Sequence, residues 1–196
     1  MNKATFLDIK KHWTYIMQTA VLISAFILNV LMIPVFKNYD GSGKISNIPS
    51  FIAGIIICLL IIPVLKFKRK KYYRIWFGVA IVSCLAGLIA LAFYFVDYHK
   101  HTAKYNEQLI LVGTPSDMTP EGKRQMKMLE EKFFHRPIEV NELIWSNAGK
   151  VTEIWDKDSL DEIYYLLLIQ FMLVIILFSV FSITIFQAIK CFQYTK

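Results

Sequence analysis

Charge is scarce in this sequence, and long stretches carry none. Only 19% of the 196 residues are charged and 56% are hydrophobic, whereas an ordinary soluble domain has about 25% charged residues. The four longest apolar runs contain no Asp, Glu, Lys, Arg or His. Because proton relays and ion-coupled transporters need ionisable groups inside the membrane, this absence argues against a pump or a coupled transporter.

Cysteine is equally scarce. Cys58 and Cys84 lie within apolar runs, and Cys191 lies just beyond the last run. The long polar connection between residues 97 and 162 contains no cysteine. A disulfide-stapled outer domain within one chain is therefore excluded, and we expect buried, unreactive thiols instead.

Motifs that carry catalysis are missing from the sequence. It has no G-x-S-x-G, Walker A, H-E-x-x-H or C-x-x-C pattern. His99 and His101 beside Asp97 resemble a metal cluster, but two histidines without a second pair favour solvated side chains near the membrane. The acidic run 156–162 lacks the glycine and the spacing of a calcium loop. We expect no enzyme, no cofactor and no metal site.

The apolar runs are long enough to cross a bilayer. A helix needs about 20 apolar residues to span a hydrocarbon core about 30 Å thick. The runs cover residues 13–36, 48–65, 75–96 and 163–189. The first is too long for the apolar region of a signal peptide and no A-x-A-like site follows it, so we interpret it as an uncleaved anchor. The predicted fold class is an all-α integral membrane protein with four transmembrane helices.

The excess of positive charge lies on one side of these spans. The N-terminal arm, residues 66–74 and the tail 190–196 hold eleven Lys and Arg against one Asp, whereas the other two connections hold eleven against fourteen Asp and Glu. Basic residues that flank spans stay in the cytoplasm. We expect a protein of the bacterial inner membrane with both termini in the cytoplasm and with connections 37–47 and 97–162 outside.

The predicted organisation has three parts. Residues 1–96 form an N-terminal arm and three transmembrane helices, residues 97–162 form a small α+β extracytoplasmic domain, and residues 163–196 form the fourth helix and a cytoplasmic tail. Without disulfides, a domain of this size is only marginally stable alone. We expect it to pack on the membrane, on the 37–47 connection or on neighbouring copies.

Local signals predict three elements in the outer domain. Residues 107–112 are typical of a short strand. Thr119 followed by Pro120 predicts the start of a helix that runs to about His135. The alternation at the start of residues 138–144 is typical of an edge strand.

A capping box precedes the fourth span. Ser159 and Glu162 have the spacing of this motif, so we expect the fourth helix to begin at Leu160. Such a start joins the outer domain rigidly to the helix. A signal outside the membrane then has a path to Cys191 and the tail.

The basic segment KFKRKKYYR, residues 66–74, is the largest charged feature on the cytoplasmic side. Its candidate contact residues are Lys66, Lys68, Arg69, Lys70, Lys71 and Arg74. Setting the topology alone explains the cluster, as does attraction to anionic lipid headgroups. Docking of a soluble cytosolic partner is a second interpretation, and nucleic-acid binding is a third. We expect anionic lipid and a protein partner, and no direct contact with nucleic acid.

Small and polar residues mark candidate contacts between helices. A stripe of small residues lies on one face of the third span and suits close packing within the chain or in an oligomer: Ala80, Ser83, Gly87 and Ala90. Asn29 and Gln170 are candidates for a polar pore constriction or for an interhelical hydrogen bond. The phenylalanines of the fourth span favour lipid contact, among them Phe171 and Phe178.

Three functions fit these features. The first is a non-enzymatic membrane sensor or scaffold that couples the outer domain to a cytosolic partner. The second is a small oligomeric channel or pore-forming effector, lined by Asn29 or by Ser and Thr of the fourth span. The third is an accessory subunit of a larger transport or export complex.

The architecture resembles small four-span membrane components of bacterial anti-phage systems, and it is similar to the membrane subunit of the Kiwa system. The resemblance covers overall size, four helices, cytoplasmic termini and an outward segment between the third and fourth spans. It implies a homo-oligomer that detects membrane disturbance during phage attack and works with a soluble, DNA-binding partner. It assigns no role to individual residues.

Overall fold

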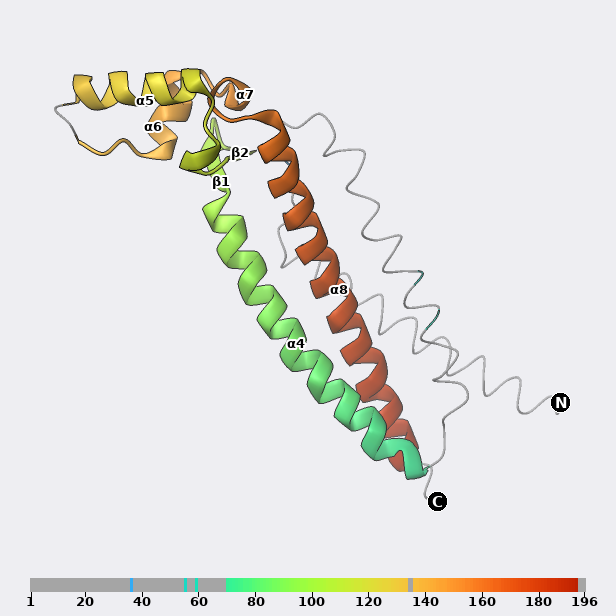
Figure 1. Ribbon diagram of the computed structural model, residues 1–196. Coiled ribbons are helices and arrows are strands. Elements are labelled where there is room, and N and C mark those ends of the chain that lie inside the picture. Colours follow the sequence, from blue (N-terminus) through green and yellow to red (C-terminus); the bar gives the residue numbers. More distant parts are fainter. Residues whose placement is uncertain (1–35, 37–54, 56–58, 60–69, 134–135, 194–196) are drawn as a thin grey trace. The chain divides into compact units, whose positions relative to one another are not determined.

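The computed structural model describes residues 36, 55, 59, 70–133 and 136–193. Two long helices and a cluster of short elements make up this part of the chain (Figure 1). In chain order the elements are η1 (Lys70–Tyr72), α4 (Tyr73–Lys100), β1 (Thr102–Tyr105), β2 (Gln108–Leu111), η2 (Pro115–Asp117), α5 (Pro120–Lys132), α6 (Val140–Ser146), α7 (Val151–Ile154) and α8 (Lys157–Gln193). The predictions for spans 13–36 and 48–65, apart from residues 36, 55 and 59, lie outside the described residues, as do those for Asn29, Lys66, Lys68 and Arg69.

The chain divides into two compact units, and both divisions fall within long helices. One unit contains residues 93–170 and Phe36, and we call it the β unit because it holds both strands. The other contains the described residues up to Ala92 and from Phe171 onward, and we call it the helix unit. The β unit therefore includes the end of α4 and the first turns of α8, and it is wider than the predicted outer domain 97–162.

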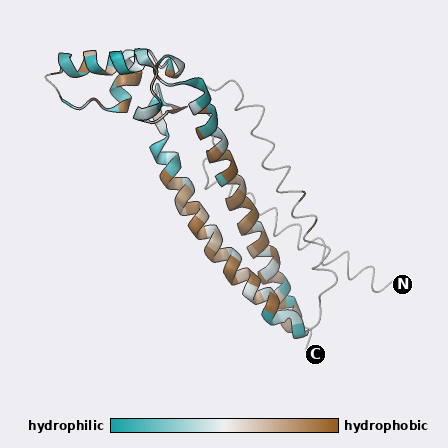
Figure 2. Ribbon diagram, viewed as in Figure 1, coloured by the Kyte–Doolittle hydropathy of each residue, from teal (hydrophilic) through white to brown (hydrophobic). Residues whose placement is uncertain are grey.

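Both long helices are apolar enough to cross a membrane. Mean hydropathy over an 18-residue window reaches 2.5 in α4 and 2.8 in α8, and apolar colour covers the middle of each helix (Figure 2). They coincide with the predicted spans 75–96 and 163–189. However, α8 begins at Lys157 rather than at Leu160, because the main-chain N–H of Leu160 already donates to the carbonyl of Asp156.

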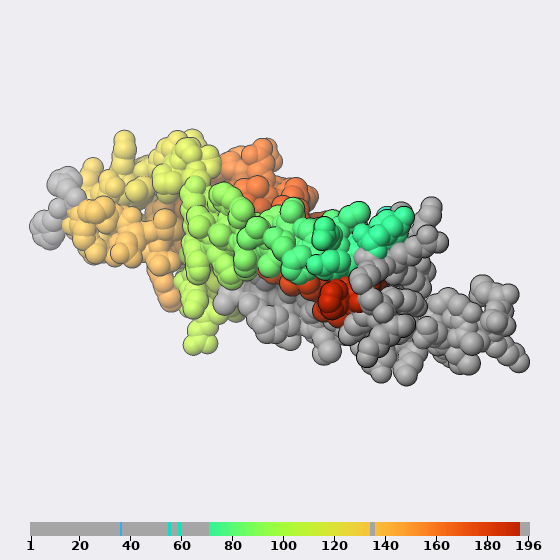
Figure 3. Space-filling view, turned by 90° about the horizontal axis from the view of Figure 1, so that it is seen from below, coloured from blue at the N-terminus to red at the C-terminus, as the bar shows by residue number. Residues whose placement is uncertain are grey.

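The two long helices differ in how far they are covered. In the apolar window of α4 22% of the residues are buried, against 44% in α8. Side chains of α4 lie open on the face seen in Figure 3, and Val82 is 67% exposed. Phe171 of α8 is 1% exposed and Phe178 is half-buried. The expectation that the phenylalanines of this helix face lipid is therefore wrong for Phe171.

A β-hairpin follows directly after α4. Strand β1 pairs antiparallel with β2, so that Thr102 lies opposite Leu111 and Tyr105 opposite Gln108. The two turn residues, Asn106 and Glu107, have φ values of 48° and 61°, as the tightest hairpin turns require. The predicted strand at 107–112 is confirmed as β2, while β1 was not predicted.

The structure confirms one predicted helix and corrects one predicted strand. Helix α5 begins at Pro120, and the side chain of Thr119 caps it by accepting from the N–H of Gly122 at 3.0 Å. The predicted edge strand 138–144 is wrong, because most of it belongs to α6. Glu139 and Glu142 form a reciprocal capping box that starts this helix, so local capping outweighs a short alternation.

Trp155 forms the centre of the β unit and is fully buried. Its indole N–H donates to the carbonyl of Thr114 at 3.2 Å. A Cβ added at Gly113 would lie 2.4 Å from the Trp155 ring, so glycine is required for this close approach. Lys157 at the start of α8 follows two residues later, which attaches the helix to the core of this unit.

Candidate functional site

Helix α8 begins in the β unit and continues into the helix unit. It runs without a break over 37 residues, which is about 55 Å at 1.5 Å per residue. The strand bridge between Met118 and Trp155 and the hydrogen bond from Asp156 N–H to the Asp117 carbonyl hold the chain just before its start. The predicted rigid connection between the outer domain and the fourth helix stays a prediction.

Main-chain contacts also join α5 to the segment that precedes α8. The N–H of Thr119 donates to the carbonyl of Ile154 at 2.9 Å, and the Thr119 hydroxyl donates to the carbonyl of Glu153 at 2.7 Å. A Cβ on Gly122 would lie 2.3 Å from the Ile154 carbonyl oxygen. Helix α5 thus lies directly on α7, without intervening side chains.

Gln170 forms an interhelical hydrogen bond within the β unit. Its Nε2 donates to Oδ2 of Asp97 on α4 at 2.6 Å, across 73 residues of sequence. The other amide atom, Oε1, is buried and has no partner among the described residues. This geometry matches the packing interpretation of Gln170, and its role as a pore constriction stays a prediction.

The stripe of small residues on α4 faces the interior of the helix unit. Ala80 is fully buried and Ser83 is 7% exposed. A Cβ on Gly87 would lie 3.4 Å from the ring of Phe178 on α8, while Ala90 is half-buried. At Gly87 the stripe meets another helix of the same chain.

The ends of α4 and α8 meet near the basic segment. The rings of Tyr73 and Phe192 lie 5.7 Å apart. Lys71 and Arg74 are exposed, and the ammonium group of Lys190 lies over the ring of Phe186 at 4.9 Å. The three cations at this end therefore come from η1, α4 and α8, and the last of these is distant from the other two in the sequence.

The two histidines after α4 have different environments. His99 is exposed, whereas His101 is 5% exposed and its Nδ1 lies 3.3 Å from the carbonyl oxygen of Val112. The expectation that both are solvated is wrong for His101, because the hairpin covers it. Among the described residues no group of His, Cys, Asp and Glu is arranged to hold a metal ion.

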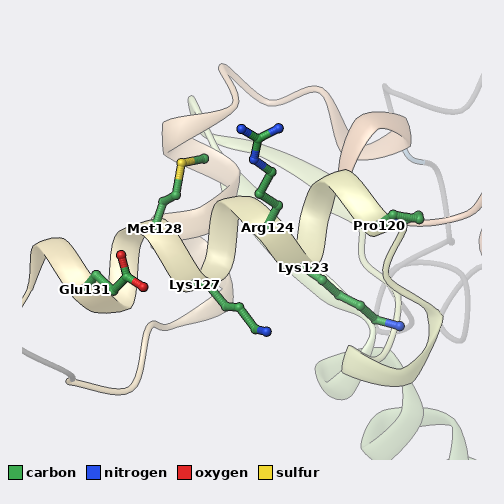
Figure 4. A pocket seen from close by; sticks show the side chains of 6 residues that line it. All are labelled: Pro120, Lys123, Arg124, Lys127, Met128 and Glu131. Carbon is green, nitrogen blue, oxygen red and sulfur yellow. The ribbon is translucent and has the colours of Figure 1, made fainter.

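Helix α5 carries a shallow depression on its open face. Figure 4 shows the side chains that line it: Pro120, Lys123, Arg124, Lys127, Met128 and Glu131. Arg124 and Met128 point to one side of the helix, while Lys123 and Lys127 point to the other. Because the cations do not converge and an acid lies among them, this surface is a solvated helix face.

Hydrogen bonds lower the pKa of two carboxyl groups in the β unit. The hydroxyls of Thr114 and Ser116 donate to Asp117 at 2.5 and 3.0 Å and hold the pKa of this carboxyl below its usual value. Arg136 donates to Glu142 at 2.5 Å and lowers the pKa of Glu142. Both residues are partly exposed, and these hydrogen bonds contribute to the stability of the β unit.

No protein-family model, no curated protein and no solved structure matches this chain.

Proposed function

We propose that this chain is a non-enzymatic, oligomeric sensor or scaffold of the bacterial inner membrane, which couples an outer domain to a soluble cytosolic partner. The β unit is then the outer domain, and both termini are cytoplasmic. The single observation that carries the proposal is the unbroken helix α8, which starts two residues after the fully buried Trp155 and ends beside the basic segment. A change in the β unit then has a stiff element through which to act.

The cationic end of the helix unit is the proposed contact for the partner. Lys71 and Arg74 are exposed there, and Lys66, Lys68 and Arg69 precede them in the sequence. Such a surface attracts anionic lipid headgroups and an acidic protein surface alike. The likeness to the Kiwa membrane subunit supports a role in anti-phage defence, with no direct contact between this chain and nucleic acid.

Two hydroxyl side chains of α8 favour packing over a conducting path. The hydroxyls of Ser182 and Thr184 donate to main-chain carbonyls of their own helix, at 2.7 Å to Phe178 and at 2.8 Å to Val180. These groups are buried and already satisfied, so they offer no open polar lining. Oligomer contacts in this proposal use the open face of α4, on which Val82 and Leu85 are exposed, rather than the buried small-residue stripe.

The test is co-purification of the tagged chain with soluble proteins encoded beside its gene. In the variant Lys71→Glu/Arg74→Glu we expect partner retention to fall at least tenfold, with membrane insertion unchanged. Lys104→Glu/Lys123→Glu makes the same charge change at two exposed positions of the β unit and serves as the matched control. Equal retention by all three proteins, or leakage of cells on overexpression without any partner, would contradict the proposal.

A further inference from the structure

The hydrogen bond between Asp97 and Gln170 indicates which residues of α4 and α8 lie at the same depth relative to the membrane. Asp97 ends the apolar run 75–96 of α4. A carboxylate at the centre of a bilayer costs about 2.5–3.5 kcal/mol, so Asp97 is expected at the membrane surface. Because Gln170 donates to it at 2.6 Å, Gln170 lies at the same depth to within about one helical turn.

We infer that α8 enters the bilayer at Phe171 rather than at Ile163, so that residues 157–170 form a helical stem outside the membrane. Residues 171–189 span about 28 Å at 1.5 Å per residue, which matches a hydrocarbon core of about 30 Å. The whole apolar run 163–189 would span about 40 Å and exceed that core.

Four apolar side chains at the start of this run are buried, whereas Tyr165, Leu166 and Ile169 are between 45% and 62% exposed. Ile163, Tyr164, Leu167 and Leu168 are between 0% and 9% exposed within the β unit. The ring of Tyr164 meets that of Phe36 edge-on, with centroids 6.3 Å apart. Packing in the core of the β unit therefore accounts for these residues without lipid. The sequence pattern alone does not separate this core helix from a membrane span, since both are apolar.

The stem adds detail to the proposed function. It rests on that proposal for the side of the membrane on which the β unit lies. A domain that contacts the bilayer directly moves with the lipid surface. A domain with a stem is instead attached to the membrane-spanning part of α8 through a helical segment outside the membrane. The bond between Asp97 and Gln170 then joins α4 to this stem at the point of entry.

Accessibility of single cysteines tests the stem. Leu166 and Leu173 are 45% and 47% exposed, and seven residues place them on the same face of α8. Each is replaced by Cys in a chain whose native Cys58, Cys84 and Cys191 are changed to Ser, and intact spheroplasts are treated with a membrane-impermeant maleimide. We expect the thiol at position 166 to react at least ten times faster than the thiol at position 173. Tyr165→Cys, at a 49% exposed position, repeats the first measurement.

Glu162→Cys is the reference, because Glu162 is exposed and precedes both proposed points of entry. If position 162 reacts while 166 and 165 are as slow as 173, the stem is overturned and the proposed orientation stands. If the thiols at 162, 165 and 166 react only in inverted vesicles, the orientation in the proposed function is wrong while the point of entry is upheld. If 162, 166 and 173 react equally fast, α8 does not cross the membrane and both proposals fail.

Discussion

The β unit and the helix unit are each stabilised by a different kind of internal contact. In the β unit, hydrogen bonds from the main chain and the side chain of Thr119 join the start of α5 to α7, and Trp155 fills the space that Gly113 leaves open. In the helix unit, described contacts between α4 and α8 are apolar, such as Gly87 against Phe178 and Tyr73 against Phe192. A unit in water gains stability from apolar burial, whereas helices in lipid depend on close packing and a few polar contacts.

The largest expected effect is the loss of Trp155. Trp155→Ala removes a fully buried side chain, and we expect the β unit to lose about 3–5 kcal/mol of stability. Limited proteolysis of the purified protein in detergent measures the loss. Trp145→Ala is the matched control, because Trp145 is 56% exposed and its ring lies 4.7 Å from that of Tyr105. Equal protease resistance of the two variants would show that Trp155 does not organise this unit.

Two glycine substitutions separate close packing from helix propensity. In Gly122→Ala the new Cβ meets the Ile154 carbonyl oxygen at 2.3 Å, and such overpacking costs about 1–3 kcal/mol. In Gly78→Ala the Cβ meets no atom of the described residues within 4 Å, so we expect unchanged or higher stability. Thermal unfolding in detergent distinguishes them, and a neutral Gly122→Ala would contradict the direct contact of α5 with α7.

The packing of the helix unit can be tested at Gly87. A Cβ there makes ordinary contact with the Phe178 ring at 3.4 Å, so Gly87→Ala is expected to be close to neutral. Gly87→Leu displaces the ring and should cost about 1–3 kcal/mol. Resistance to a denaturing detergent measures the effect, and Phe178→Ala in the same chain should restore part of it. Failure of that second change to restore resistance would mean that the two residues do not pack together.

The polar contact between the long helices should contribute less. A double-mutant cycle with Asp97→Leu and Gln170→Leu is expected to give a coupling of about 0.6 kcal/mol, with an upper bound near 1.7 kcal/mol. Chemical unfolding in detergent provides the four free energies. A coupling of zero would show that this hydrogen bond does not join α4 to α8.

The smallest expected effect is on pH dependence. Asp117 and Glu142 have pKa values in the folded chain below their ordinary values of 3.8 and 4.5. Their ionised forms therefore stabilise the β unit above those values, and this contribution is lost as the pH falls below them. Both residues are partly exposed, so solvent screening keeps the effect small. Asp117→Asn should flatten the loss of protease resistance between neutral and acidic pH, while a steeper loss would contradict the sign.

Local signals predicted some elements correctly and others not. Thr119 and Pro120 determine the start of α5 by themselves, so the prediction was confirmed. Strand β1 has little apolar alternation and exists through its pairing with β2, which a single segment does not reveal. The alternation of Ile138 and Val140 is too short to outweigh the capping box that starts α6.

Contacts between residues that are distant in the sequence could not be predicted, because they depend on how separate segments pack in the fold. Gln170 was a candidate for an interhelical hydrogen bond, but its partner Asp97 lies 73 residues away. The burial of His101 depends on the hairpin that follows it. The small stripe was predicted from spacing, yet only the fold shows that Gly87 meets Phe178.

Coupling along α8 is the central claim, and the native thiol of Cys191 reports on it directly. Cys191 is fully buried near the C-terminal end of α8, whereas Trp155 precedes the N-terminal end of this helix. In a chain carrying Cys58→Ser and Cys84→Ser, we compare the rate of Cys191 alkylation with and without Trp155→Ala. Disrupting the β unit should change that rate at least threefold. An unchanged rate in a chain whose β unit has lost its protease resistance would contradict coupling between the β unit and the far end of α8.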